Sequence, residues 1–167
     1  ANANTPLTRM DFHPHSGGCV LAAWFYTYGM TGDRRYLDTA CPMLDRMIQE
    51  FPGIRRYIIS KTCESARFLL PLTLGWYYTR EPRYRSALEE QAAYLRSRMD
   101  ACGAIREGGS NIGADVEGGD LGLTYSGEET VSDQLYTTGF AAMNFWIAYK
   151  ATGEKQYLED FHRVADY

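Results

Sequence analysis

The sequence YGMTGDRRYLDT at residues 28–39 returns as YKATGEKQYLED at residues 149–160. Both copies hold tyrosine, threonine, glycine and an acidic residue in the same order, followed by tyrosine and leucine at the same spacing. Glycine suits the left-handed backbone that ends many helices, and an acidic residue favours the start of the next helix. The two copies therefore predict the same helix–turn–helix connection at Gly32 and at Gly153.

A third, degenerate copy reads YYTREPRYRSAL at residues 77–88. It keeps the threonine and the later Tyr84, but Glu81 and Pro82 stand in place of the glycine turn. Proline is favoured at the first position of a helix. We therefore expect a third connection that lacks the glycine turn, with the next helix beginning at Pro82.

Each connection joins two helices of different character. The segments before the turns, at residues 17–28, 65–78 and 135–149, are apolar on nearly all sides, whereas the segments after them carry one apolar stripe. A helix that is apolar all round is buried, and a helix with one apolar stripe is peripheral. The sequence thus predicts an all-α fold of helical hairpins in an inner and an outer layer. The residues expected to be more buried than Arg46, Glu89 and Arg98 of the outer layer are Trp24, Phe25, Leu69, Leu72, Trp76, Ala141, Phe145 and Trp146.

Composition limits the class of protein. The 167 residues carry a net charge of -4 and are 45% hydrophobic, which suits one globular domain over residues 1–167 and provides no basic surface for nucleic acid. No apolar run reaches the roughly 20 residues of a membrane span. The four cysteines form no CxxC pair, and Cys19 and Cys41 fall in apolar helical patterns that predict burial. The chain begins without methionine and ends within an apparent helix, so we expect part of a longer catalytic domain.

The repeated turns resemble those of the six-hairpin glycosidases, which fold as (α/α)6 toroids. The stretch SDQLYTTGFAAMNFWIAYKATGEKQYLE at residues 132–159 is similar to an inner-helix hairpin of unsaturated glucuronyl and rhamnogalacturonyl hydrolases. The resemblance implies a glycoside hydrolase that acts on polysaccharide-derived oligosaccharides by carboxylate acid–base chemistry, typically in bacterial polysaccharide degradation. This chain supplies three hairpins, which is half or a fragment of the toroid, and the uncovered inner helices predict self-association.

The alternation also predicts where a site would lie. All the short turns share one rim, so the N-terminal ends of the inner helices and the long connections share the other, and loops carry function more often than the elements they join. We expect Asp133 and Glu64 at that second rim to act as the catalytic carboxylates. The residues expected to bind substrate there are His13, His15, Arg67, Gln134 and Tyr136.

Each candidate has a structural alternative. Asp133 caps a helix as readily as it transfers a proton, Ser16 is a possible cap beside the two histidines, and Glu64 with Arg67 has the spacing of a surface ion pair. The histidines at 13 and 15 lack a third ligand nearby, so we predict neither a metal nor a cofactor. The alternative function is a non-catalytic helical module that binds a glycan or a protein. The sequence leaves periplasmic, secreted and cytoplasmic locations open.

Overall fold

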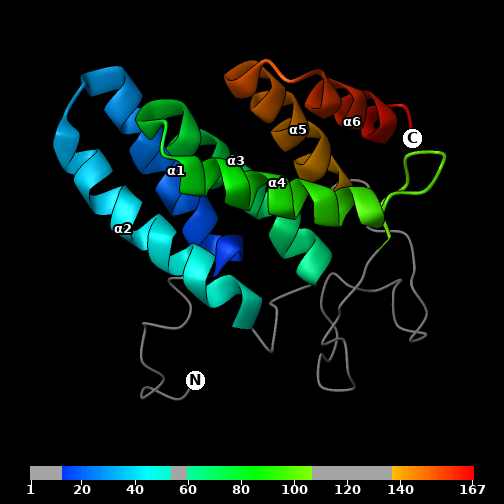
Figure 1. Ribbon diagram of the computed structural model, residues 1–167, viewed down its shortest axis with the longest axis horizontal. Coiled ribbons are helices and arrows are strands. Elements are labelled where there is room, and N and C mark those ends of the chain that lie inside the picture. The colour runs from blue at the N-terminus through cyan, green and yellow to red at the C-terminus, as the bar shows by residue number, and fades with distance from the viewer. Residues whose placement is uncertain (1–12, 54–59, 107–136) are drawn as a thin grey trace.

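The computed structural model describes residues 13–53, 60–106 and 137–167, and within them the fold is all-α. These residues form six α-helices and one short 3-10 turn, and an isolated antiparallel bridge between Met99 and Ile105 is present in them in place of any strand. In chain order (Figure 1) these elements are α1 (Pro14–Thr31), α2 (Arg34–Glu50), η2 (Phe51–Gly53), α3 (Lys61–Thr79), α4 (Pro82–Ser97), α5 (Gly139–Thr152) and α6 (Lys155–Ala165).

Helix α3 lies at the centre of the array. It packs against α1 on one side, α5 on the other and α4 across its length, while α2 packs mainly on α1 and α6 packs on α5. Helices α1, α3 and α5 therefore form an inner row, and α2, α4 and α6 form an outer row. This arrangement confirms the alternation of inner and outer helices predicted from the sequence.

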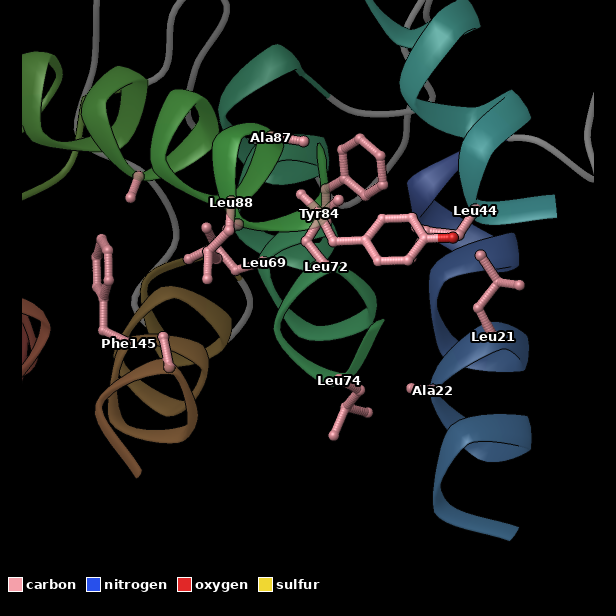
Figure 2. Packing of buried hydrophobic residues seen from close by; sticks show 14 of the residues in the cluster. Leu21, Ala22, Leu44, Leu69, Leu72, Leu74, Tyr84, Ala87, Leu88 and Phe145 are labelled. Atoms are coloured by element: carbon pink, nitrogen blue, oxygen red, sulfur yellow. The ribbon is translucent and has the colours of Figure 1, made fainter. Parts of the chain in front are cut away.

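The core lies between the two rows (Figure 2). Phe25, Leu69, Leu72 and Phe145 of the inner helices have no more than traces of exposed surface, and Leu44, Tyr84 and Leu88 of the outer helices meet them. Trp24 and Trp76 are half-buried and pack against this core. The burial prediction is therefore confirmed for five inner-helix residues, which are buried while Arg46 and Glu89 are exposed and Arg98 is half-buried: Phe25, Leu69, Leu72, Ala141 and Phe145.

Trp146 contradicts the prediction, since 40% of it is exposed. Its ring packs beside Tyr149 on α5 and beside Phe161 on α6, at centroid distances of 5.7 and 5.4 Å. The prediction that Cys19 is buried is also wrong, and Cys41 is only half-buried. The reason is the same for Cys19 and Trp146, because α1 and α5 end the inner row in the part of the chain that the structure describes, and each has another inner helix on one side only.

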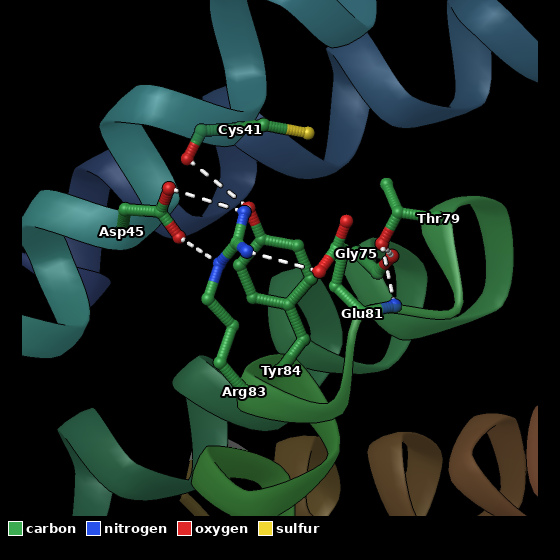
Figure 3. Close-up of polar contacts among 7 residues, drawn as sticks. All are labelled: Cys41, Asp45, Gly75, Thr79, Glu81, Arg83 and Tyr84. Atoms are coloured by element: carbon green, nitrogen blue, oxygen red, sulfur yellow. Dashed lines mark hydrogen bonds and ion pairs between the residues drawn. The ribbon is translucent and has the colours of Figure 1, made fainter.

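The three turns share one geometry, including the copy without glycine. Gly32 and Gly153 have φ values of 69° and 77°, and Arg80 occupies the equivalent position with φ 57°. In each turn the threonine before this residue accepts a hydrogen bond from the backbone N–H of the acidic residue after it, at 3.2 Å; the acidic residues are Asp33, Glu81 and Glu154 (Figure 3 shows the second). The expectation that residues 81 and 82 replace the glycine turn was wrong, because Arg80 adopts the glycine conformation and Pro82 begins α4 as predicted.

Arg80→Gly should raise the free energy of unfolding by about 0.5–1 kcal/mol. A left-handed backbone costs a non-glycine residue roughly 1–2 kcal/mol. The exposed Arg80 side chain recovers part of this cost by lying 5.3 Å from the ring centroids of Trp76 and Tyr77. The measurement is urea unfolding of both proteins. As a control, Arg46→Gly within α2 should instead lower stability by about 1 kcal/mol, and a loss of stability in Arg80→Gly would contradict the expectation.

Candidate functional site

Helix α1 begins earlier than the sequence suggested. Its first residue is Pro14, whose fixed φ suits the first turn, and the residue before the helix is His13. His15 therefore lies inside the first helical turn, and Ser16 does not cap the helix. The short motif His-Pro-His thus places two imidazoles at the N-terminal end of an inner helix.

Ser60 caps the N-terminus of helix α3, which was not expected from the sequence. The Ser60 hydroxyl accepts a hydrogen bond from the backbone N–H of Cys63 at 3.0 Å, so the helix starts at Lys61. Two other hydroxyl residues near this end of the helix bind elsewhere: the Thr62 hydroxyl lies 3.3 Å from that of Tyr94, and the Ser65 hydroxyl donates to Gln91 Oε1 at 2.9 Å. Glu64 is consequently in the first turn of α3, level with the start of α1.

The carboxylate of Glu64 joins the two helices. Its Oε2 lies 2.9 Å from His13 Nδ1, and its Oε1 lies 3.4 Å from His15 Nδ1. The Glu64 side chain has no exposed surface, whereas the imidazoles of His13 and His15 are 9% and 19% exposed. The three side chains form a rim cluster in which the carboxylate is innermost and the imidazoles lie between it and solvent.

The electrostatics of this rim cluster favour an ionised carboxylate. Burial by itself raises the pKa of Glu64, but hydrogen bonds and charge interactions with His13 and His15 outweigh it and hold the pKa below its ordinary value. A buried charge without partners would be expelled or neutralised, so the two imidazoles explain how an ion can persist here. Glu64 is therefore a hydrogen-bond acceptor at neutral pH and not a proton donor.

Arg67, one turn further along α3, extends the rim cluster to a third helix. Its Nη1 donates to the backbone carbonyl oxygen of His15 at 2.8 Å, and its guanidinium lies 4.4 Å from the ring centroid of Phe140 on α5. Only 8% of Arg67 is exposed, and the partners of Glu64 are the two imidazoles rather than this arginine. The alternative of a surface ion pair between Glu64 and Arg67 is therefore wrong, because both side chains are buried where three inner helices meet.

Two buried amides near the rim cluster were not singled out from the sequence. Asn144 Nδ2 donates to the backbone carbonyl of Ala66 at 2.8 Å and so ties α5 to α3, while Gln91 accepts from Ser65 and ties α4 to α3. Both interrupt otherwise apolar patterns in their helices, at AAMNFWI and in the stripe after Tyr84. A single amide side chain within an apolar helix face is thus the sequence feature that could have predicted these contacts between helices.

The remaining predicted residues, Asp133, Gln134 and Tyr136, lie outside the described residues, so their roles stay predictions. Within residues 13–53, 60–106 and 137–167 no three His, Cys, Asp or Glu side chains gather as ligands for a metal ion. In the same ranges no helix has the length and apolar character needed to cross a membrane.

Comparisons with protein-family models, with curated proteins and with solved structures gave no significant match. The helical array and the rim cluster are therefore the features from which a function can be inferred.

Acid should weaken the contribution of Glu64 to stability. A carboxyl group whose pKa is lowered by folding stabilises the protein above its unfolded pKa, near 4.3 for glutamate, and loses that effect as the pH falls through the folded value. The difference in unfolding free energy between the wild type and Glu64→Gln should therefore shrink when the pH is lowered from about 6 to about 3. Urea unfolding at several pH values measures it, with Glu90→Gln at an exposed site of α4 as the control. A difference that grew in acid would contradict the ionised state of Glu64.

Proposed function

We propose that this chain is part of a carbohydrate-active enzyme that hydrolyses glycosidic bonds in polysaccharide-derived oligosaccharides. The observation that carries the proposal is the rim cluster, in which a buried ionised carboxylate, two imidazoles and a guanidinium meet at the N-terminal ends of the inner helices. A buried carboxylate whose pKa is perturbed by specific neighbours is typical of functional sites, and Glu64 is such a group. The resemblance of the repeated turns to those of six-hairpin glycosidases supplies the reaction class.

The geometry of the rim cluster suggests a different catalytic role for each of its residues. The carboxylate of Glu64 lies against the Nδ1 atoms of both imidazoles, and we assign the histidines the part of binding a sugar hydroxyl or moving a proton. Glycoside hydrolysis needs a proton donor for the leaving oxygen and usually a second carboxylate. Since Glu64 is ionised, we assign the donor to Asp133 and give Glu64 the part of base or of orienting group for the histidines.

One observation favours the non-catalytic alternative. The Glu64 side chain has no exposed surface, so a sugar would reach the imidazoles and Arg67 before it reached the carboxylate. A buried carboxylate that only joins α1 to α3 would suit a glycan-binding or protein-binding module equally well. Fold alone does not decide between the two, because one architecture can host many functions.

The deciding experiment is a hydrolysis screen of the full-length protein that contains this chain, on saturated and unsaturated oligosaccharides. New reducing ends or loss of the absorbance of the double bond would report turnover, and calorimetry on the same panel would report binding. Turnover that Asp133→Asn abolishes supports the enzyme. Binding without turnover on any member of the panel would replace the enzyme with the binding module.

A further inference from the structure

Arg67 contacts helix α1 through its backbone as well as through its side chain. Because Pro71 has no N–H group, it cannot donate the usual helical hydrogen bond to the Arg67 carbonyl. The Cβ of an alanine at Gly18 would lie 3.6 Å from this carbonyl oxygen, so the backbone of α1 lies directly against it. The guanidinium reaches α1 three residues earlier, where Nη1 donates to the His15 carbonyl oxygen at 2.8 Å. Arg67 thus holds the beginning of α1 at two points.

The same guanidinium is held by the third inner helix. It lies 4.4 Å from the ring centroid of Phe140 on α5, a distance at which a cation is attracted to a ring face. One turn further along α5, Asn144 donates to the Ala66 carbonyl oxygen at 2.8 Å. A planar guanidinium can stack on a ring and donate hydrogen bonds at once, which the ammonium group of lysine does less well. Only 8% of Arg67 is exposed, so the residue is enclosed by the three inner helices.

The backbone that Arg67 holds belongs to one of the two histidines of the rim cluster. The carbonyl oxygen of His15 accepts from Arg67, and its imidazole Nδ1 lies 3.4 Å from Glu64 Oε1. This separation is near the upper limit for a hydrogen bond, whereas His13 Nδ1 lies 2.9 Å from the same carboxylate. A small displacement of the first turn of α1 would therefore break the contact between His15 and Glu64.

We propose that Arg67 is a positioning residue of the rim cluster, which fixes the first turn of α1 and thereby holds the His15 imidazole against the Glu64 carboxylate. Arg67 acts on the carboxylate through His15 rather than through contact with a substrate. This role differs from the substrate binding that was expected for Arg67 from the sequence. Its effect on turnover rests on the proposed function, whereas its effect on Glu64 follows from the contacts alone.

The test is the pKa of Glu64 in the full-length protein that contains this chain. Carbon-13 NMR of the side-chain carboxyl groups measures it, and the absence of one signal in Glu64→Gln identifies the group. Burial raises this pKa and the two imidazoles lower it, so displacing one imidazole should raise the pKa of Glu64 in Arg67→Lys. Lysine keeps the positive charge, so an effect of charge alone would leave the pKa where it is in the wild type. An unchanged pKa in a folded Arg67→Lys protein would overturn the proposal.

Arg96→Lys is the matched control. The guanidinium of Arg96 also lies near a ring, 5.5 Å from the Tyr157 centroid, and it pairs with Asp160 at 2.7 Å in the outer row. Its replacement should lower the melting temperature and leave the pKa of Glu64 unchanged. Equal rises of that pKa in both lysine variants would mean a general loosening of the fold, and would overturn the specific role of Arg67.

Phe140→Leu keeps the proposal testable if circular dichroism shows that Arg67→Lys does not fold. This change removes the ring beside the guanidinium and retains an apolar side chain on α5. The pKa of Glu64 should again rise, because the guanidinium is held less firmly against the His15 carbonyl. A folded Phe140→Leu protein in which that pKa equals the wild-type value would count against the proposal.

Turnover provides a second readout. In Arg67→Lys, kcat should fall by roughly 100-fold, the effect that a displacement of about 1 Å can have on a catalytic geometry, and KM should stay nearly unchanged. A residue that bound the substrate would instead raise KM with kcat unchanged, and this result would overturn the proposal. If the wild type hydrolyses no oligosaccharide, the proposed function fails, and the pKa of Glu64 in Arg67→Lys still decides whether Arg67 positions the rim cluster.

Discussion

Glu64→Gln should lower turnover on the best oligosaccharide substrate by roughly 100-fold to 10,000-fold, the usual effect of losing a positioned acid–base group. Glutamine keeps the shape of the side chain, but its amide nitrogen cannot accept a hydrogen bond. One of the two contacts to His13 and His15, at 2.9 and 3.4 Å, must therefore be lost together with the negative charge. The measurement is kcat and kcat/KM as a function of pH, at a temperature well below the melting point of both proteins.

A second buried carboxylate provides the control. Asp160 on α6 is fully buried and lies 2.7 Å from Arg96 in the outer row, away from the rim cluster. Asp160→Asn should lower the melting temperature while leaving turnover unchanged. The comparison therefore distinguishes a loss of stability, caused by removing a buried charge, from a loss of catalytic activity. If Glu64→Gln behaved in the same way, the rim cluster would be structural and the proposed division of roles would be wrong.

Asp133→Asn distinguishes two mechanisms. Asparagine caps a helix about as well as aspartate, so a capping residue would tolerate the change. Loss of turnover in both Asp133→Asn and Glu64→Gln would support a pair of carboxylates. Loss only in Asp133→Asn would support a route with a single acid.

The layer order was readable from the sequence because it depends on local patterns. The repeated Thr-Gly-acid turn and the change from all-round apolar to striped helices both report burial without reference to distant residues. The sequence did not show that Arg80 takes the place of the turn glycine, because the threonine before it and the acidic residue after it specify the turn. The surrounding hydrogen bonds hold a non-glycine residue in the left-handed conformation at that point.

The rim cluster was only partly predictable, because it depends on contacts between distant residues. The sequence placed His13, His15, Glu64 and Arg67 on one rim, but it could not show that the carboxylate meets the imidazoles rather than the arginine. That choice follows from where the helices begin. A start of α1 at Pro14 turns both histidines toward α3, and a cap at Ser60 puts Glu64 level with them.

Gly103→Ala should lower the free energy of unfolding by about 2–5 kcal/mol. Gly103 has φ 94°, a conformation that costs an alanine roughly 1–2 kcal/mol. An added Cβ would also lie 1.6 Å from the Arg163 backbone carbonyl oxygen, and relieving such a contact typically costs a further 1–3 kcal/mol. Urea unfolding of both proteins measures the difference.

The physical reason for this large effect is that Gly103 joins two parts of the chain through backbone alone. It lies in the turn after α4, where Met99 and Ile105 pair and the N–H of Gly103 donates to the Asp100 carbonyl at 3.0 Å, and it meets the last turn of α6. Gly32→Ala is the matched control, because Gly32 has φ 69° and no atom within 4 Å of an added Cβ. Gly32→Ala should lower the free energy of unfolding by roughly 1–2 kcal/mol, which is the cost of the left-handed backbone conformation alone. Equal losses in the two variants would mean that α6 shifts freely away from the turn, and that the close approach of Gly103 to Arg163 contributes nothing to holding the last helix in place.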